Sequence, residues 1–94
     1  MVKPVMGIVS GYFNPLTIGH LRYIQAASGL CDCLVVIVNN DKQVKLKGNI
    51  PFQNEQERLY IVGNLRDVDD VQLSMDKDKS VCETIHWLHE IYSS

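Results

Sequence analysis

The segment Cys33-Leu-Val-Val-Ile-Val38 restricts the fold more than any other part of this sequence. It is a continuous, uncharged apolar run rich in β-branched residues, which is typical of a β-strand. A strand that exposes one face to water alternates apolar and polar residues, whereas a strand buried on both faces does not. The run therefore predicts a central strand of a parallel sheet and, with it, an α/β fold.

Strands and helices alternate along the rest of the chain. Val5 to Ser10 predicts a first strand that is buried on both faces, and Asp69 to Leu73 predicts a short third strand. The interval from Asn39 to Gln53 predicts a long polar connection. With the helices below, the order βαβαβα predicts a Rossmann-like, three-layer fold with a parallel sheet and right-handed crossovers.

Three helices are predicted from periodicity and capping signals. The first runs from Gly19 to about Ser28, and the second follows Asn54, which forms a capping box with Glu57. The third opens with a capping box between Ser80 and Glu83. One stripe of this last helix carries Val81, Ile85, Leu88 and Tyr92.

Length and composition limit the class of protein. Ninety-four residues predict one domain, residues 1–94, without an internal repeat or linker. The net charge of −2, from 9 Lys+Arg against 11 Asp+Glu, leaves no basic surface, so we expect no nucleic-acid partner. No apolar run reaches the roughly 20 residues of a membrane span, and the N-terminus does not resemble a signal peptide, so we expect no membrane partner.

The cysteines indicate a reducing compartment. Cys31, Cys33 and Cys82 are odd in number and include a Cys-x-Cys pair, which is not a disulfide framework. We interpret Cys33 and Cys82 as small buried residues and expect a cytoplasmic protein.

No protein-held metal site is predicted. The acidic stretch 67–78 lacks the Gly and terminal Glu of an EF-hand and is interpreted as a solvated loop. His86 and His89 lack a third ligand and are assigned to a partly exposed helix face.

The loop after the first strand is the main candidate for a functional site. Its sequence is Gly11-Tyr-Phe-Asn-Pro-Leu-Thr-Ile-Gly-His20. In an open α/β sheet, ligands bind at the carboxyl ends of the strands, and a helix that starts near Ile18 aims free N–H groups at this place. Thr17 and His20 are three residues apart and project from one helix face, which suits phosphate oxygens. Structural interpretations remain open: Thr17 could be only the N-cap, His20 a solvated or structural residue, and Gly11 a turn residue.

This loop resembles the Gly-x-Phe-Asp-x-x-(His/Thr)-x-Gly-His signature of the cytidylyltransferase-like nucleotidyltransferases, with the spacing of every element kept. The resemblance continues through Asp32-Cys-Leu-Val-Val-Ile-Val38 with Asn40-Asp41, Lys45-Leu-Lys-Gly48 with Pro51, Glu57-Arg58, and Leu65-Arg-Asp-Val-Asp69. These spacings are similar to those of glycerol-3-phosphate cytidylyltransferases and of the nucleotidyl-transferring domain of ADP-heptose synthases.

The resemblance implies an enzyme that transfers a cytidylyl or adenylyl group from CTP or ATP to a small phosphorylated acceptor and releases pyrophosphate. Mg²⁺ would accompany the nucleotide, held by phosphates and water. The implied catalytic residues are His20, Thr17 and Lys47. The implied nucleotide- or phosphate-binding residues are Gly11, Tyr12, Phe13, Asn14, Gly19 and Lys45, the last as the fallback for Lys47. Arg58 and Arg66 would face the acceptor phosphate, although each could equally be a surface arginine.

Two substitutions bear on the choice of nucleotide. Asn14 stands where most members have Asp, and Thr17 where many have the first His of the His-x-Gly-His motif. Both substitutions occur in adenylyl-transferring branches, such as the nicotinamide-mononucleotide adenylyltransferases. The rest of the chain favours cytidylyl transfer, which we place slightly ahead, and the sequence does not identify the acceptor.

The chain stops at Tyr92-Ser-Ser94, where family members continue into a fourth strand and a base-binding segment. We therefore expect an incomplete domain that lacks the last strands, with the first strand at the sheet edge and covered by a second copy in a homodimer. The alternative is a truncated or degenerate nucleotide-binding member without turnover. A third, weaker hypothesis is a flavodoxin-like module that binds another phosphate ligand.

Overall fold

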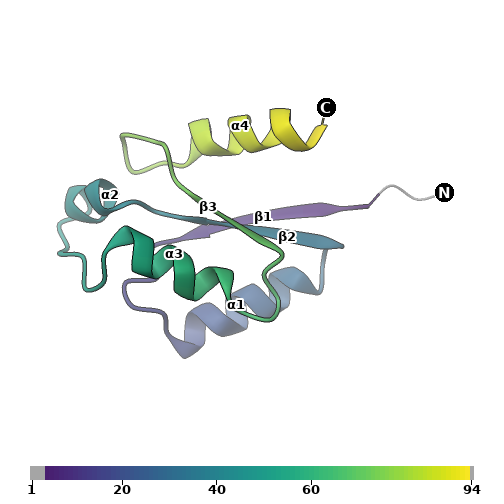
Figure 1. Ribbon diagram of the computed structural model, residues 1–94, viewed down its shortest axis with the longest axis horizontal. Coiled ribbons are helices and arrows are strands. Elements are labelled where there is room, and N and C mark those ends of the chain that lie inside the picture. Colours follow the sequence, from purple (N-terminus) through teal and green to yellow (C-terminus); the bar gives the residue numbers. More distant parts are fainter. Residues whose placement is uncertain (1–3, 94) are drawn as a thin grey trace.

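A three-stranded parallel sheet lies between two layers of helices in the computed structural model, which describes residues 4–93 (Figure 1). The elements in chain order are β1 (Met6–Gly11), α1 (Ile18–Ser28), β2 (Cys33–Val38), α2 (Asp41–Leu46), α3 (Glu55–Gly63), β3 (Asp70–Leu73) and α4 (Cys82–Ser93). The strand order is β1-β2-β3, and both strand pairs are parallel. The predicted α/β fold with a parallel sheet is thus confirmed, with Cys33–Val38 as its central strand.

The central strand β2 supplies side chains to a core on each face of the sheet, because successive residues of a strand point to opposite sides. Val36 packs with Ile24 of α1 and Val62 of α3. Val35 packs with Leu88 of α4 on the other face. Figure 1 shows α1 and α3 below the sheet and α4 above it. The uninterrupted apolar run of β2 is the consequence of this double burial.

Strand β1 is less buried than the sequence predicts. All of Met6–Gly11 keeps intermediate exposure, so the expectation of a strand buried on both faces is wrong. The reason is that β1 lies at the edge of the described sheet and pairs only with β2.

The long polar connection between β2 and α3 contains the six-residue helix α2, which the sequence analysis does not predict. Asn40 caps this helix: its side chain accepts a hydrogen bond from the backbone N–H of Gln43, and the Gln43 side chain accepts one from the N–H of Asn40. Gln43 and Val44 are buried. A helix this short shows no apolar periodicity, but the Asn-x-x-Gln spacing is a capping signal that could have predicted it.

Helix α3 begins where the sequence predicts, since the Asn54 side chain accepts a hydrogen bond from the N–H of Glu57. Helix α4 has a different cap from the predicted Ser80 and Glu83 pair. The carboxylate of the buried Asp76 accepts hydrogen bonds from the N–H groups of Glu83 and Thr84 and from the Thr84 hydroxyl. Only the tertiary fold brings Asp76, in the preceding loop, under the start of the helix.

These hydrogen bonds also set the ionisation of Asp76. Burial alone would raise the pKa of this carboxyl, but the hydrogen bonds from Thr84, Glu83 and Ser74 outweigh it and hold the pKa below its usual value. The folded state therefore favours the charged form of Asp76.

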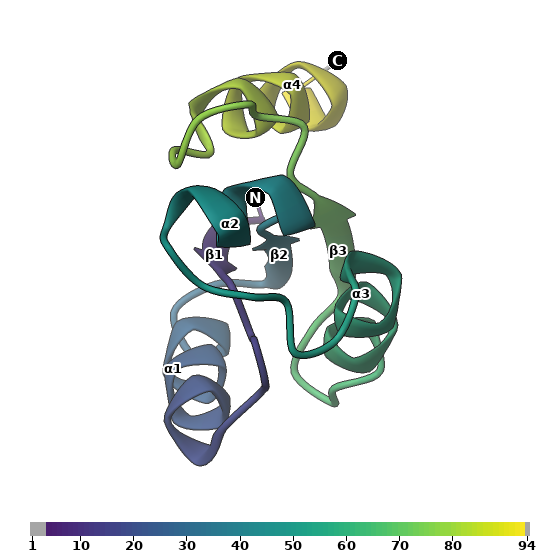
Figure 2. The same ribbon diagram turned by 90° about the vertical axis from the view of Figure 1, so that its left-hand side faces the viewer.

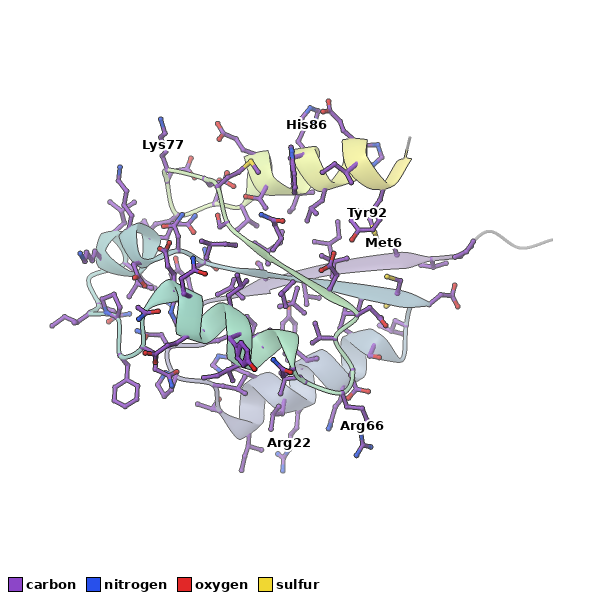
Figure 3. The ribbon with its side chains drawn as sticks, viewed as in Figure 1. Met6, Arg22, Arg66, Lys77, His86 and Tyr92 are labelled. Carbon is purple, nitrogen blue, oxygen red and sulfur yellow. The ribbon has the colours of Figure 1, made fainter. Side chains whose placement is uncertain are left out.

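The apolar stripe of α4 is only partly used. Leu88 is buried and Val81 packs beside it, whereas Ile85 and Tyr92 are exposed. Tyr92 points from α4 toward the sheet (Figure 3), and its hydroxyl donates to Oδ2 of Asp70 over 2.6 Å. This hydrogen bond, with a smaller contribution from partial desolvation of the hydroxyl, raises the pKa of Tyr92 to about 12.

The cysteines of the described chain are free thiols. Burial raises the pKa of the Cys33 thiol, and the nearby Asp69 carboxylate adds to the shift. Cys82 is exposed, so its interpretation as a buried residue is wrong: α4 turns Thr84, two residues away, inward instead. Among residues 4–93, no helix is both long enough and apolar enough to cross a membrane.

Candidate active site

A cleft of about 460 Å³ opens beyond the carboxyl end of β1. Figure 2 views the molecule from this end, where α2 lies in front of the strands. One wall consists of Tyr12, Phe13, Asn14, Pro15, Thr17 and His20, and the other of Val44, Lys47, Asn49, Ile50 and Phe52. The carboxyl ends of parallel strands are where open α/β sheets bind ligands, and the volume is in the range of small-molecule sites.

Thr17 and His20 form the N-terminus of α1 together. Thr17 is the N-cap residue, and its backbone N–H donates to Nδ1 of His20 over 3.0 Å. The backbone N–H of His20 points back to Oγ1 of Thr17 at 3.5 Å. The expected pairing of the two residues is confirmed, and Thr17 also caps the helix.

This capping arrangement determines which ring nitrogen of His20 is free to donate. Because Nδ1 accepts the Thr17 N–H, the neutral imidazole carries its proton on Nε2. The ring of the buried Phe13 packs edge-on against His20, with ring centroids 5.0 Å apart. His20 therefore offers the cleft a donor on Nε2 while its ring is held on two sides.

The two glycines of the predicted motif differ in what the fold requires of them. A Cβ on Gly11 would collide with the Phe13 ring, so packing excludes a side chain there. A Cβ on Gly19 would meet only Oγ1 of Thr17 at 3.7 Å, and the residue lies exposed in the first turn of α1. The fold needs Gly11, whereas it leaves open why residue 19 is glycine.

Asn14 ties the two walls of the cleft together. Its Nδ2 donates to the carbonyl of Ile50 over 3.0 Å, and its Oδ1 accepts the N–H of Phe52 over 2.6 Å. The side chain was expected to contact nucleotide or phosphate. It lines the cleft, but its amide is engaged with the opposite wall.

The structure separates the two candidate lysines. Lys47 caps the C-terminus of α2 and lines the cleft, with Nζ 4.4 Å from the centre of the Tyr12 ring. Lys45 is exposed on α2 and is not among the lining residues. Of the two, Lys47 is positioned to reach a ligand in this cleft.

Arg58 has a different place from the one expected. Its side chain is 1% exposed, and the guanidinium donates to the carbonyls of Tyr12, Asn39 and Gln53. It also pairs with Oδ1 of Asp41 at 2.6 Å. The expectation that Arg58 faces an acceptor phosphate, or else the surface, is corrected: the guanidinium is enclosed and its donors are engaged by the protein.

Arg66 is not part of the cleft. It lies exposed in the connection from α3 to β3, which enters the sheet at the amino end of β3. Figure 3 shows its side chain beside α1, apart from α2. The expectation of an acceptor-phosphate contact from Arg66 is therefore also corrected, because the ligand cleft is at the carboxyl ends of the strands.

Sequence reasoning missed much of the second wall. Asn49, Ile50 and Phe52 were assigned only to a polar connection, yet they line the cleft. The available signal was the presence of two large apolar residues, Ile50 and Phe52, in an otherwise polar loop.

The cleft has the electrostatic character of an anion site. Within residues 4–93, no Asp or Glu side chain lines it, while Lys47 and the N-terminus of α1 contribute positive potential. The described part of the chain also holds no group of three or more His, Cys, Asp or Glu residues that could bind a metal ion.

Comparison with known proteins agrees with this geometry. The sequence profile of the family described as Cytidylyltransferase-like matches residues 8–93. The crystal structure of a lipopolysaccharide core biosynthesis protein from Thermoplasma volcanium superposes with a TM-score of 0.83 at 28% identity, covering 90% of this chain and 68% of that chain.

Curated relatives carry two kinds of name. An FAD synthase from Thermoplasma acidophilum is 32% identical over 80 residues, which cover 83% of this chain and 56% of the relative. The bifunctional protein HldE from Hyphomonas neptunium is 44% identical over 68 residues, covering 70% of this chain and 14% of that protein. The chain thus spans about half the length of the FAD synthase and a small part of HldE.

Proposed function

Since the chain belongs to the cytidylyltransferase-like family, we propose that it transfers a nucleotidyl group from a nucleoside triphosphate to a small phosphorylated acceptor with release of pyrophosphate. The observation that carries this proposal is the geometry of the cleft. A phosphate placed at the N-terminus of α1 would lie near Thr17 and His20 on one wall and Lys47 on the other.

The proposed reaction is an in-line displacement at the α-phosphorus. An oxygen of the acceptor phosphate forms a bond to the α-phosphorus, and the bond to the β-phosphate breaks to release pyrophosphate. The acceptor phosphate is already anionic near neutral pH, so no protein nucleophile or strong base is needed, and catalysis consists of positioning and charge stabilisation.

Each wall of the cleft has a role in this reaction. Nε2–H of His20 donates to phosphate oxygens as negative charge develops on them. The Thr17 hydroxyl, 3.1 Å from Nδ1 of His20, adds a neutral polar group. Lys47 neutralises phosphate charge from the opposite wall. The loop around these groups is formed by Gly11, Tyr12, Phe13 and Asn14. Gly19 has no side chain and so leaves room for the substrate to approach the backbone closely.

Magnesium enters as part of the substrate. With no carboxylate lining the cleft among residues 4–93, the protein supplies no oxygen cage there, which fits an ion held by the nucleotide's phosphates and water. Bound in this way, Mg²⁺ would offset the charge of the triphosphate.

Both nucleotides belong in the test of specificity. The chain outside the motif favours CTP, which the sequence analysis places slightly ahead, whereas Thr17 and Asn14 of the motif favour ATP. The product that gives the FAD synthase relatives their name contains an adenylyl group, which makes ATP the direct competitor. We propose a cytoplasmic setting, because the described cysteines are free thiols.

The experiment measures pyrophosphate release from CTP and from ATP, each combined with glycerol 3-phosphate, a sugar 1-phosphate or flavin mononucleotide. Release with one pair, strongly reduced by His20→Asn, is the expected result. A folded chain that binds nucleotide and releases no pyrophosphate with any pair would contradict turnover and leave the alternative of nucleotide binding alone.

We also propose a homodimer. Strand β1 pairs on one side only within the described residues, and an unpaired strand edge is a template for another chain. Sedimentation equilibrium at micromolar concentration is expected to give twice the chain mass of 10.7 kDa, and a purely monomeric species would contradict the proposal.

A further inference from the structure

Helix α2 carries Lys47 at its C-terminal end and so places the cation of the second wall of the cleft. A helix of six residues is too short to be stable without contacts to the rest of the fold. The position of Lys47 therefore depends on the side chains that attach α2 to its neighbours.

Gln43 provides such an attachment one helical turn before Lys47. Its backbone carbonyl accepts the N–H of Lys47 at 3.1 Å, and its side chain is 0% exposed. The side-chain Oε1 accepts the backbone N–H of Asn40 at 2.9 Å and Nδ2 of Asn39 at 3.1 Å. This end of the amide holds the start of α2.

The other end of the amide reaches beyond the helix. Nε2 of Gln43 donates to the carbonyls of Asp78 and Ser80, each over 2.8 Å, in the loop that leads from β3 into α4. Helix α2 lies below this loop in both views (Figure 1, Figure 2). Both donors and both acceptor positions of the amide are thus used by the protein.

The two loop carbonyls explain why this position holds an amide. A capping box needs only an acceptor here, and a glutamate would supply it as well. A carboxylate at Gln43 would face two carbonyl oxygens without a proton to donate. The attachment to the loop before α4 is therefore an additional function of Gln43, separate from capping.

The neighbours of Gln43 face the cleft. Val44 is 0% exposed and lines the cleft together with Lys47, three residues later. Nζ of Lys47 lies 4.4 Å from the centre of the Tyr12 ring, on the opposite wall. Release of α2 from the loop would leave Lys47 without a fixed position relative to that wall.

We propose that Gln43 is a positioning residue of the cleft: its side-chain amide clamps α2 to the loop before α4 and thereby holds the cation of Lys47 at the substrate phosphates. This inference rests on the proposed function, in which Lys47 neutralises phosphate charge. Gln43 itself does not line the cleft and acts only through Lys47.

The test measures the affinity for inorganic triphosphate by calorimetry, so that no turnover is required. Gln43→Met keeps the length of the side chain and removes all four hydrogen bonds, and the milder Gln43→Asn keeps an amide that is too short to bridge them. Each variant is made in the wild type and in Lys47→Gln. Urea unfolding confirms that each chain is folded under the conditions of the binding experiment.

Thr84→Val is the matched control. Thr84 is 0% exposed, and its hydroxyl donates to Asp76 and accepts the N–H of Met75, in the same loop. The substitution removes buried hydrogen bonds of that loop and leaves the partners of Gln43 in place. We expect a lower urea midpoint and a triphosphate affinity within about twofold of the wild type.

Gln43→Met is expected to weaken triphosphate binding by about fivefold in the wild type. In Lys47→Gln, which itself loses about tenfold, the same substitution is expected to change the affinity by less than about twofold. A residue that only stabilises the fold would not lose its effect on binding when Lys47 is removed. Gln43→Asn should show the same dependence on Lys47 with a smaller loss.

Three results would overturn the inference. The first is an equal loss of affinity from Gln43→Met with and without Lys47, and the second is a comparable loss in Thr84→Val. The third is failure of both Gln43 variants to fold, because the amide would then serve stability alone. A loss that depends on Lys47, in a chain that releases no pyrophosphate with any pair, would contradict only the proposed function.

Discussion

The ring of Phe13 occupies the space that a side chain on Gly11 would need. A Cβ on Gly11 would lie 2.7 Å from Cζ of Phe13, closer than nonbonded carbon atoms approach. Phe13 is 1% exposed, has a positive φ of 50° and packs edge-on against His20. Residue 11 is thus coupled through Phe13 to the imidazole that lines the cleft.

Gly11→Ala is therefore expected to destabilise the fold and to disturb the cleft together. Overpacking of a buried ring costs about 1–3 kcal/mol of unfolding free energy, and the Phe13 ring is buried against the position of the added Cβ. Urea unfolding measures the stability, and calorimetry with CTP measures the site. Gly19→Ala is the control: its Cβ meets only Oγ1 of Thr17, so we expect the stability to be kept or to rise by up to about 1 kcal/mol. Equal destabilisation by both variants would contradict the specific role of the Gly11–Phe13 contact.

His20 variants separate capping from phosphate binding. His20→Asn keeps an acceptor near the position of Nδ1, so stability is expected to fall by less than about 1 kcal/mol. It loses the donor at Nε2, and the rate of pyrophosphate release is expected to fall by about 10²–10³-fold. His20→Gln, whose amide can reach the Nε2 position, should retain more activity than His20→Asn. The opposite ranking would show that the imidazole acts through the cap rather than through Nε2.

The two lysines of α2 and its C-terminus allow a matched comparison. Lys47→Gln removes the cation that lines the cleft and is expected to weaken CTP or ATP binding by about tenfold, with a smaller salt dependence than the wild type. Lys45→Gln removes the same charge two residues away, outside the lining, and should leave the affinity nearly unchanged. Calorimetry at low and high salt tests both. A larger loss in Lys45→Gln would reassign the phosphate contact to the fallback residue.

Substitution of the buried Arg58 is expected to lower the free energy of unfolding rather than to act directly on substrate binding. Arg58→Met removes the charged donor from Oδ1 of Asp41 and from three backbone carbonyls, which is expected to cost about 3–5 kcal/mol. Arg66→Met, at an exposed arginine outside the cleft, should change the unfolding free energy by less than about 0.5 kcal/mol. Urea unfolding at neutral pH compares them. Similar unfolding midpoints for the two variants would rule out the proposed role of the buried guanidinium.

The lowered pKa of Asp76 is expected to make the free energy of unfolding depend on pH. Its pKa is lower in the folded chain than in the unfolded chain, where an Asp carboxyl titrates near about 3.9. The unfolded state therefore takes up the proton first, so the contribution is present above about pH 4 and is lost as pH falls through the folded pKa. Asp76→Asn is expected to be less stable at neutral pH and to lose less stability between about pH 5 and pH 2. Parallel pH curves for wild type and variant, from urea midpoints, would contradict this assignment.

Local sequence signals predicted the parts of the fold that depend on neighbouring residues. The apolar run Cys33–Val38 identified the central strand, because double burial leaves a composition that the sequence shows directly. Thr17 and His20 were paired from their spacing alone, because a helix turn brings residues three apart together. Helix α2 was missed because six residues are too few for a periodic pattern.

The contacts between residues far apart in the sequence are determined only by the tertiary structure. Arg58 and Arg66 are the same residue type near one helix, yet the first is enclosed by oxygens from several loops and the second lies in solvent at the other end of the sheet. Asp76 caps α4 from outside the helix, and Asn14 reaches 36 and 38 residues along the chain to fix the second wall of the cleft. Sequence by itself determined the central strand, the start of α1 and the pairing of Thr17 with His20, because those depend on local spacing. The burial of a charge and the second wall of the cleft depend on packing between segments, which only the folded chain establishes.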